Sequence, residues 1–426
     1  MATLETPTKL RDLQRALYQR AKKEPRFRFY ALYDKAYRPD VLAHALALSK
    51  DNGGAPGPDG KTFEQVALDG EAALLEALHD ELKTKQYRPG PVRRVYIPKP
   101  GGGERPLGIP NIRDRVVQTA AKLILEPIFE ADFDPSSYGF RPKRDAHQAI
   151  EAVRESLAQG MCWVLDADIA SYFDMIPHDH LMKAVAERVV DGAMLALIKM
   201  FLAAPVVDER EGGPPRRSKQ GTPQGGVISP LLANIYLHLL DRNFRRRVER
   251  GEFDGRLVRY ADDFVLLSWR EPVRERTWIE SLMSRLGLRL HPEKTRIVHA
   301  ARTHFDFLGY RFRRRSRYVT LDIAKKSLER VHEAIRQRTR ETGLGIEELV
   351  EQLSAYIRGA RQYFGRIRAR RLFSMDHFVD QRVARWWARK TASPRVAWSL
   401  VYGDRLQRRY GLERFYVPVA SRPATS

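Results

Sequence analysis

The stretch LVRYADDFVLLS, residues 257–268, places two adjacent carboxylates inside an apolar segment. Its apolar residues predict two short strands joined by a turn, with Asp262 and Asp263 at that turn. An unpaired charge in an apolar environment costs free energy, so a buried pair of carboxylates requires a compensating cation. An ordinary solvated turn is the alternative for this pair taken alone, because Asp is common in turns.

A second stretch, WVLDADIASYF at 163–173, also carries an acid at the end of an apolar run. Asp168 follows that run, where a side-chain charge is again costly. Two strands that both bring acids into a core favour the interpretation that they converge on cations. Magnesium prefers carboxylate oxygen and keeps waters for substrate phosphates, and two such ions about 3.5–4 Å apart can serve phosphoryl transfer.

The net charge of the chain indicates the kind of partner. There are 75 Lys and Arg residues against 53 Asp and Glu residues, a formal net charge of +22. A large folded protein with this excess suits a polyanion, so nucleic acid is the expected partner. A general basic bias that aids solubility is one alternative. Membrane-surface binding is another, but no amphipathic anchor stands out.

Length and composition limit the class of protein. The chain has 426 residues, of which 43% are hydrophobic, enough for two or three domains with cores of their own. It contains no run of about 18 apolar residues, and its N-terminus has no hydrophobic signal core. We therefore expect a cytoplasmic protein without membrane contact. The single cysteine, Cys162, excludes disulfides and thiolate zinc sites.

The pattern along the chain predicts an α+β protein followed by a helical region. Gly and Pro at 51–60 interrupt a helical start, and one helix is predicted over about 62–85. Residues 92–110 alternate as a strand, a glycine turn and a second strand, and a long helix is predicted at 229–248. After about residue 320 the sequence is helical and basic to its end.

Seven blocks of sequence give a more specific indication. In chain order they are RPLGIPNIRDRVVQ (105–118), SSYGFRP (136–142), DADIASYFDMI (166–176), QGTPQGGVISPLLANIYLHLLD (220–241), YADD (260–263), LGLRLHPEKT (286–295) and FDFLGYRF (305–312). The blocks and their order resemble the conserved motifs of reverse transcriptases. The four residues YADD would be a weak indication alone, whereas seven blocks in the right order are a specific one. Because GAPGPDGKT (54–62) and YIRGARQYFG (356–365) are similar to the fingers extension and maturase region of group II intron-encoded enzymes, the resemblance is to that family.

The resemblance implies an α+β right-hand polymerase, with fingers and palm followed by a mostly helical basic thumb and maturase module. The implied domains are an N-terminal fingers extension at 1–90, reverse transcriptase fingers and palm at 91–318, and a helical thumb and maturase domain with a short basic C-terminal region at 319–426. Many members carry a C-terminal endonuclease. Since this chain stops at PVASRPATS and has one cysteine, we expect no endonuclease.

The implied chemistry is RNA-directed DNA polymerisation. An RNA template, a DNA primer or product strand and dNTPs would be the partners, and the reaction would depend on two Mg²⁺ ions. Asp168 and Asp262 would hold both ions, with Asp263 beside them as a less direct ligand. The carboxylate charges at 168, 262 and 263 would then be compensated by metal and triphosphate.

The same resemblance implies five nucleotide-binding residues. Lys99 and Arg105 flank the glycine turn and would reach a triphosphate, the arginine bidentately. Gln224 would lie against the incoming nucleotide, and Lys294 would donate a proton to the pyrophosphate leaving group. Phe173 would lie beneath the sugar and exclude a ribose 2′-hydroxyl. The alternatives are a solvated basic hairpin, a Gly-Pro turn, a solvated lysine and a core phenylalanine.

The basic C-terminal region has its own candidate residues. Arginines alternate there with aromatic residues on predicted helices, and Arg358, Arg361, Arg366 and Arg368 are the candidates for nucleic-acid binding. A helix packed with its rings buried is the alternative. In the family this region binds intron RNA and assists splicing. A primarily RNA-binding maturase, or a host-adopted reverse transcriptase for defence or repair without splicing, therefore remains as an alternative function.

Overall fold

The computed structural model describes residues 4–98, 103–212, 214–217, 219–222, 225–316, 318–391 and 405–418. The chain divides into two compact units. The first unit contains Met1–Ala149, Leu165–Leu266 and Glu271–Arg296, and the second contains Ile150–Val164, Leu267–Arg270 and Ile297–Ser426.

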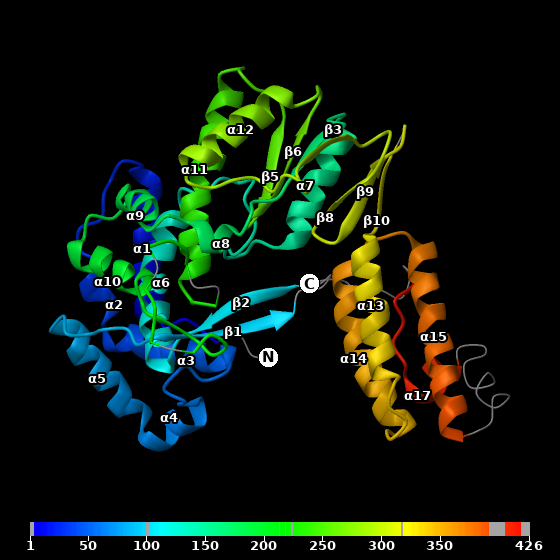
Figure 1. Ribbon diagram of the computed structural model, residues 1–426, viewed down its shortest axis with the longest axis horizontal. Coiled ribbons are helices and arrows are strands. Elements are labelled where there is room, and N and C mark those ends of the chain that lie inside the picture. The colour runs from blue at the N-terminus through cyan, green and yellow to red at the C-terminus, as the bar shows by residue number, and fades with distance from the viewer. Residues whose placement is uncertain are drawn as a thin grey trace. The chain divides into compact units, whose positions relative to one another are not determined.

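The helices and strands are labelled in Figure 1. In chain order they are α1 (Thr8–Lys23), α2 (Tyr33–Ala36), α3 (Pro39–Asn52), α4 (Phe63–Asp69), α5 (Glu71–Lys83), β1 (Val92–Pro98), β2 (Glu104–Ile109), α6 (Ile112–Glu130), α7 (Ala146–Ala158), β3 (Trp163–Ala167), α8 (Tyr172–Met175), α9 (His178–Ala186), α10 (Gly192–Leu202), β4 (Val206–Asp208), α11 (Ser229–Glu249), β5 (Arg256–Tyr260), β6 (Asp263–Ser268), α12 (Val273–Arg285), β7 (Arg296–His299), β8 (Phe305–Phe307), β9 (Tyr310–Arg314), β10 (Val319–Ile323), α13 (Lys325–Arg338), α14 (Ile346–Phe364), α15 (Ala369–Thr391) and α17 (Arg405–Tyr410).

The helical part of the first unit is built around α6. Residues on nearly every side of this helix are buried, which is typical of a helix enclosed by its neighbours. It packs against α1, α2, α3, α5 and α11. Asp114 on α6 accepts hydrogen bonds from the Tyr87 hydroxyl (2.7 Å) and the Gly90 amide (3.0 Å). These bonds fix the chain that leads into β1.

The predicted helix over about 62–85 is two helices, so that prediction is wrong at Gly70. The φ angle of Gly70 is 103°, in the left-handed region that ends a right-handed helix. The α4 helix ends before this residue, and α5 begins after it. At the other end of α4, the Thr62 side chain accepts a hydrogen bond from the Gln65 amide (3.3 Å) and caps the helix.

Two strands confirm the strand–turn–strand prediction for 92–110. β1 and β2 are antiparallel, with Arg93 opposite Ile109 and Pro98 opposite Glu104. Residues 99–102 of the turn lie outside the described residues. β4 pairs in parallel with the start of β1, so this sheet has the order β2-β1-β4.

A four-stranded sheet with the order β5-β6-β3-β7 contains both acidic stretches. Only two residues connect β5 to β6, so these strands form a hairpin, as predicted for 257–268. β6 is buried from Phe264 to Ser268, which explains its unbroken apolar run. Because β6 and β3 are neighbours in the sheet, the ends of the two acidic stretches lie close together.

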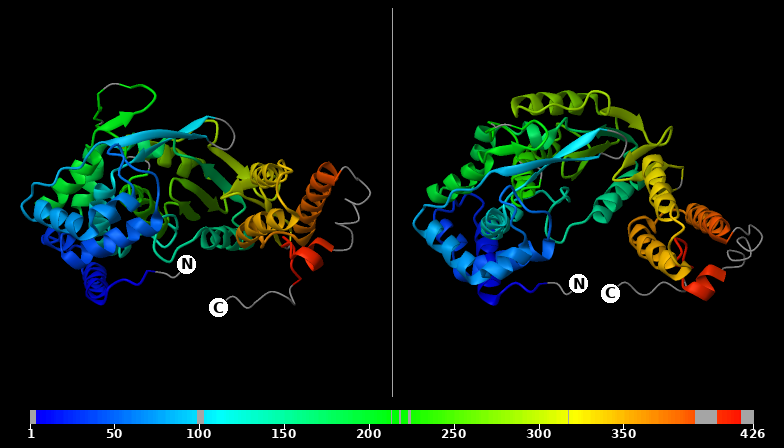
Figure 2. Two further views of the ribbon diagram at one scale, coloured as in Figure 1. Left: turned by 90° about the horizontal axis from the view of Figure 1, so that it is seen from below. Right: turned by 60° about the horizontal axis from the view of Figure 1, so that its bottom comes forward.

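The second unit combines the sheet β10-β9-β8 with helices α13, α14 and α15. In β9, Phe312 lies opposite Leu321 on one side and Phe305 on the other. The helix α13 contacts both α14 and α15, and both views in Figure 2 show the three side by side. The prediction of a helical region after about residue 320 is confirmed for α13, α14, α15 and α17, but residues 319–323 form a strand and residues 411–418 form no helix. Although α15 has 23 residues, no helix in the described ranges is long and apolar enough to cross a membrane.

A buried ion pair lies beneath the hairpin of β5 and β6. The guanidinium of Arg259 is completely buried and donates to both carboxylate oxygens of Asp241 on α11, over N–O distances of 2.5 to 3.1 Å. It also donates to the side-chain oxygen of Asn234 (3.0 Å) and to the carbonyl of Ala261 (2.8 Å). Asn234 in turn donates to the carbonyl of Gly139 (2.8 Å). Burying two charges is costly, and hydrogen bonding this complete offsets that cost.

We predict that Asp241→Ala destabilises the first unit by about 3–5 kcal/mol, because it leaves the Arg259 charge buried without its partner. Glu280→Ala is the control, since it removes a partly exposed pair with Arg276 on α12 that is worth less than about 1 kcal/mol. Urea denaturation of the purified chain, followed by circular dichroism, measures both changes. Equal unfolding midpoints for the two variants would contradict a structural role for the buried pair.

Candidate active site

The turn of the acidic hairpin has a conformation that depends on its neighbours. Ala261 has a φ angle of 57°, in the left-handed region that a residue with a side chain rarely adopts. Arg259, two residues before Ala261, is bonded through its backbone to another segment: its carbonyl accepts from the Tyr138 amide (2.8 Å), and its amide donates to the Ser136 carbonyl (2.9 Å). A Cβ atom on Gly139 would lie 2.4 Å from the Ala261 nitrogen, so only glycine fits beside this turn.

The second acidic stretch is positioned by the segment that follows α12. The Ala170 amide donates to the Arg289 carbonyl (3.0 Å), and the His291 amide donates to the Asp168 carbonyl (2.7 Å). This pairing brings the ammonium of Lys294 to 2.8 Å from the Asp168 carboxylate. The structure therefore places Lys294 directly on a predicted catalytic acid. Two residues before Asp168 on β3, the Asp166 carboxylate lies 3.2 Å from the guanidinium of Arg296.

The predicted acids form an electrostatically coupled cluster. Burial raises the pKa of Asp262, and the charge of Asp168 raises it further, while Arg105 and Arg259 oppose this rise. Burial and then the charges of Asp262, Asp168 and Asp166 raise the pKa of Asp263 to about 7. Asp263 still reaches solvent, so dissolved salt screens part of this repulsion. We call Asp166, Asp168, Asp262 and Asp263 the aspartate cluster.

The donor chemistry of the aspartate cluster fits magnesium. All of its side chains supply hard carboxylate oxygens, and their mutual repulsion is relieved by a bound cation. Within the described residues, however, no three His, Cys, Asp or Glu side chains are already arranged to hold one ion. The aspartates are neighbours, and rotation of their side chains would be needed to direct them to a common point.

Phe173, the predicted residue beneath the sugar, is half-buried on the short helix α8. Its carbonyl accepts a hydrogen bond from the Thr222 amide (2.7 Å). Its ring meets that of Phe140 edge to face, with 6.4 Å between the ring centroids. Phe140 is 50% exposed and has a φ angle of 56°, so the backbone holds an apolar ring in contact with solvent. A pair of rings of which one is exposed and the other, five residues after Asp168, is half-buried suits contact with a sugar or a base.

The other predicted nucleotide-binding residues are only partly described. Arg105 is exposed on β2, and its charge acts on Asp262. Lys99 and Gln224 lie outside the described residues. The flank of the segment that holds Gln224 is closely packed, because a Cβ on Gly225 would lie 2.4 Å from the Gly108 carbonyl on β2.

The four predicted arginines of the second unit differ in their surroundings. Arg361 donates to the Glu413 carboxylate (2.7 Å) and to the Arg414 carbonyl (2.8 Å), so it has a structural role. Arg358 lies 3.5 Å from the same glutamate. Arg366 and Arg368 are exposed. These last two have the surroundings expected of residues that contact phosphate.

Sequence analysis missed the residues that support the site. Arg259, Asp241 and Asn234 hold the hairpin from below, and Gly139 lies against its turn. One signal was available: Arg259 is a charged residue within the buried strand that leads directly into Asp262. Asp166 was also missed as a member of the aspartate cluster, although it is two residues from Asp168.

Comparison with known proteins identifies the family. The model of the reverse transcriptase (RNA-dependent DNA polymerase) family matches residues 97–312, and that of the group II intron maturase-specific domain matches residues 328–402. The chain is 39% identical to protein YkfC of Escherichia coli, over 73% of this chain and 91% of that protein. It is 31% identical to the group II intron-encoded protein LtrA of Lactococcus lactis, over 67% of this chain but only 57% of LtrA. A solved structure of telomerase from Candida albicans in complex with a telomeric RNA fragment is similar over 75% of this chain and 61% of that chain, with a TM-score of 0.43 and 14% identity.

The matched domains account for both the aspartate cluster and the net positive charge of the chain. A reverse transcriptase domain depends on divalent metal ions, in agreement with the donor chemistry of the aspartate cluster. Both matched domains bind nucleic acid, in agreement with the net charge of +22. The chain belongs to the reverse transcriptase family, as an RNA-directed DNA polymerase of the group II intron type that carries a maturase-specific domain.

Proposed function

We propose that Asp168 and Asp262 hold two Mg²⁺ ions during DNA synthesis on an RNA template, with Asp263 as a less direct ligand. The observation that carries this proposal is the placement of the four aspartates at the adjoining ends of two neighbouring strands, β6 and β3. Burial, and then the charges of the other three aspartates, raise the pKa of Asp263 to about 7. Bound magnesium supplies Lewis-acid stabilisation of the phosphoryl group that is transferred. The remaining roles fall to side chains of this protein.

Lys294 is the proposed proton donor to the pyrophosphate leaving group. Its ammonium is 2.8 Å from Asp168 and its side chain is 60% exposed, so it can turn from the carboxylate toward a bound phosphate. Arg105, exposed on β2 with its charge acting on Asp262, is proposed to bind the triphosphate together with Lys99. Gln224 is proposed to contact the incoming nucleotide.

A second proposed role is the binding of group II intron RNA by the second unit. The maturase-specific match at 328–402 supports it, and so do the exposed side chains of Arg366 and Arg368. Arg361 is a weaker candidate than the sequence suggested, because its guanidinium is bonded to Glu413 and to a backbone carbonyl. Filter binding of a group II intron RNA to the wild type and to Arg366→Glu/Arg368→Glu distinguishes this role from a host function without an intron.

The first test removes a proposed metal ligand. Asp168→Asn and Asp262→Asn should each lower the rate of dNTP addition on an RNA template at least about a hundredfold, since metal stabilisation of the transition state is worth several kcal/mol. RNA affinity should stay within about twofold, because many basic residues share the phosphate contacts. Glu280→Gln, on α12, is the control. Synthesis by Asp262→Asn at the wild-type rate would contradict the proposed site.

A second test uses stability in the absence of substrate. Because the folded-state pKa of Asp263 is raised to about 7 from an ordinary 3.8, ionisation destabilises the folded state increasingly as the pH rises from about 4 to about 7. Asp263→Asn should therefore raise the melting temperature at pH 8 without divalent ions, and have little effect near pH 4. Magnesium should raise the melting temperature of the wild type more than that of the variant.

The control for this stability test is Asp12→Asn, which removes an exposed carboxylate from α1. Differential scanning fluorimetry across the pH series, with and without Mg²⁺, measures all three proteins. A lower melting temperature for Asp263→Asn than for the wild type at pH 8 would show that repulsion within the aspartate cluster is not a source of instability.

The third test concerns sugar choice at Phe173. If its ring excludes the ribose 2′-hydroxyl, Phe173→Val removes a repulsive element and raises the efficiency of rNTP addition relative to dNTP addition. Tyr172→Phe is the control, since Tyr172 is buried and its hydroxyl donates to the Ala233 carbonyl (2.6 Å). Single-nucleotide incorporation kinetics give the two ratios. An unchanged ratio together with a lower melting temperature would mean that Phe173 serves only the core.

A further inference from the structure

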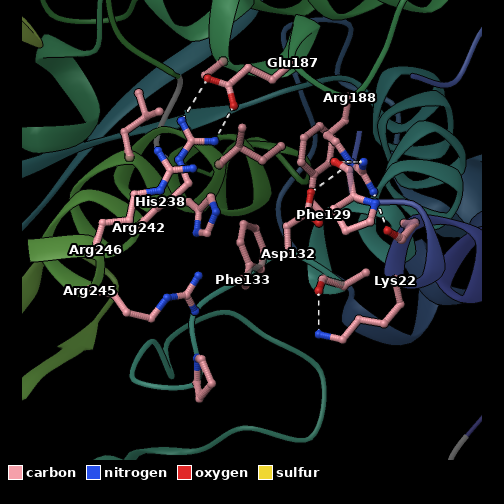
Figure 3. A pocket seen from close by; sticks show the side chains of 17 residues that line it. Lys22, Phe129, Asp132, Phe133, Glu187, Arg188, His238, Arg242, Arg245 and Arg246 are labelled. Carbon is pink, nitrogen blue, oxygen red and sulfur yellow. Dashed lines mark hydrogen bonds and ion pairs between the residues drawn. The ribbon is translucent and has the colours of Figure 1, made fainter. Parts of the chain in front are cut away.

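A cavity of about 470 Å³ lies in the first unit, away from the residues of the aspartate cluster. Its walls come from the end of α1, the end of α6 with the loop after it, α9 with the residues after it, and α11 (Figure 3). None of the four clustered aspartates lines it. Its volume falls in the range that holds a small organic ligand. We call it the basic pocket.

The inner part of the basic pocket is apolar, and the imidazole of His238 brings a polar edge to it. Phe129, Phe133 and Ile235 are buried there, and the Phe133 ring lies 5.8 Å from that of His238. Burial and then the charge of Arg242 lower the pKa of His238 to about 3, so the imidazole is neutral. Its Nδ1 atom is buried and has no hydrogen-bond partner in the described part of the chain. A ligand with a polar edge would satisfy this atom.

The rim of the basic pocket has an excess of positive charge. Five Lys and Arg side chains line the cavity against two carboxylates, Asp132 and Glu187. Both carboxylates are already paired, Asp132 with Arg188 (2.9 Å) and Glu187 with Arg242 (2.6 and 3.1 Å). Arg246 is exposed and has no ion-pair partner among the residues that the structure describes. Arg245 is exposed but paired with Asp134 (3.1 Å) and Glu249 (3.6 Å). The charge that remains available at the rim, on Lys22 and Arg246, is therefore cationic.

We propose that the basic pocket binds one nucleotide of an RNA strand, with the base in the apolar part and its phosphate at the arginine rim. A base has the flat apolar faces that Phe129 and Phe133 can contact, and a polar edge that can reach His238 Nδ1. The arginines at the rim lie on α11 at positions 242, 245 and 246, along one side of the helix. Among the described residues, Arg246 supplies the unpaired charge of this row for a phosphate, while Arg242 and Arg245 have carboxylate partners of their own. The site is additional to the proposed dNTP site.

Photo-crosslinking of single-stranded RNA that contains 4-thiouridine tests this proposal without requiring DNA synthesis. The full chain is irradiated with the RNA, and the crosslinked peptides are identified by mass spectrometry. We expect crosslinks to the peptides that contain Phe133 and His238. Arg246→Glu should lower their yield about tenfold, because it replaces a charge-assisted phosphate contact by repulsion. Leu239→Trp, which fills the cavity from α11, should lower it at least as much.

The matched control is Arg250→Glu, which makes the same charge change one helical turn further on, at a side chain that is 71% exposed and does not line the cavity. It should retain most of the crosslinking. Melting temperatures show whether each variant is folded. An excess of free AMP or UMP that abolishes the crosslinks would show that an isolated nucleotide also fits, whereas crosslinks that persist would show that the strand is needed.

Two results would overturn the proposal. One is an unchanged crosslink yield in folded Arg246→Glu and Leu239→Trp. The other is an equal loss in Arg246→Glu and Arg250→Glu, which would indicate unspecific attraction between RNA and a basic surface. Because dNTP addition on a short primer–template is measured separately, a failure of the basic pocket can be distinguished from a failure of the proposed polymerase site.

Discussion

The buried ion pair between Arg259 and Asp241 is the constraint on which the proposed active site depends. It joins the strand that ends in the acidic turn to the long helix α11, and through Asn234 it reaches the segment beside that turn. The same guanidinium donates to the carbonyl of Ala261, whose backbone is in the left-handed region. The buried guanidinium of Arg259 therefore fixes the backbone just before Asp262. The Asp262 carboxylate itself is left available to bind a cation.

The aspartate cluster opposes this stabilisation. Four carboxylates on neighbouring parts of one sheet raise the free energy of the metal-free protein, and the positive charges of Lys294 and Arg296 only partly compensate. A site that binds cations and triphosphate gains from this arrangement, because the repulsion is relieved when they bind. The rigid network below and the repulsive cluster above thus have complementary roles: the first maintains a geometry that the second would otherwise disturb.

How much could be predicted from the sequence differs between the hairpin and its surroundings. The acids at 168, 262 and 263 could be proposed from the sequence because charges inside apolar runs are conspicuous and their motifs resemble a known family. Arg259 was not singled out, because one arginine in a strongly basic chain is not distinctive until its burial is known. The basic pocket could not be predicted, since its walls come from segments far apart in the chain. The break at Gly70 depends on a single backbone angle that helical periodicity does not reveal.

The contact between Lys294 and Asp168 also has a consequence for the order in which the protein folds during translation. These residues are 126 positions apart, and the segment around Lys294 supplies the backbone partners of Asp168 and Ala170. Contacts between such distant residues form late, because a long loop must close before they contribute any stabilisation. During synthesis on the ribosome, the first acidic stretch is complete well before its partner segment has emerged. The proposed site can therefore assemble only after nearly all of the first unit, which ends at Arg296, has been translated.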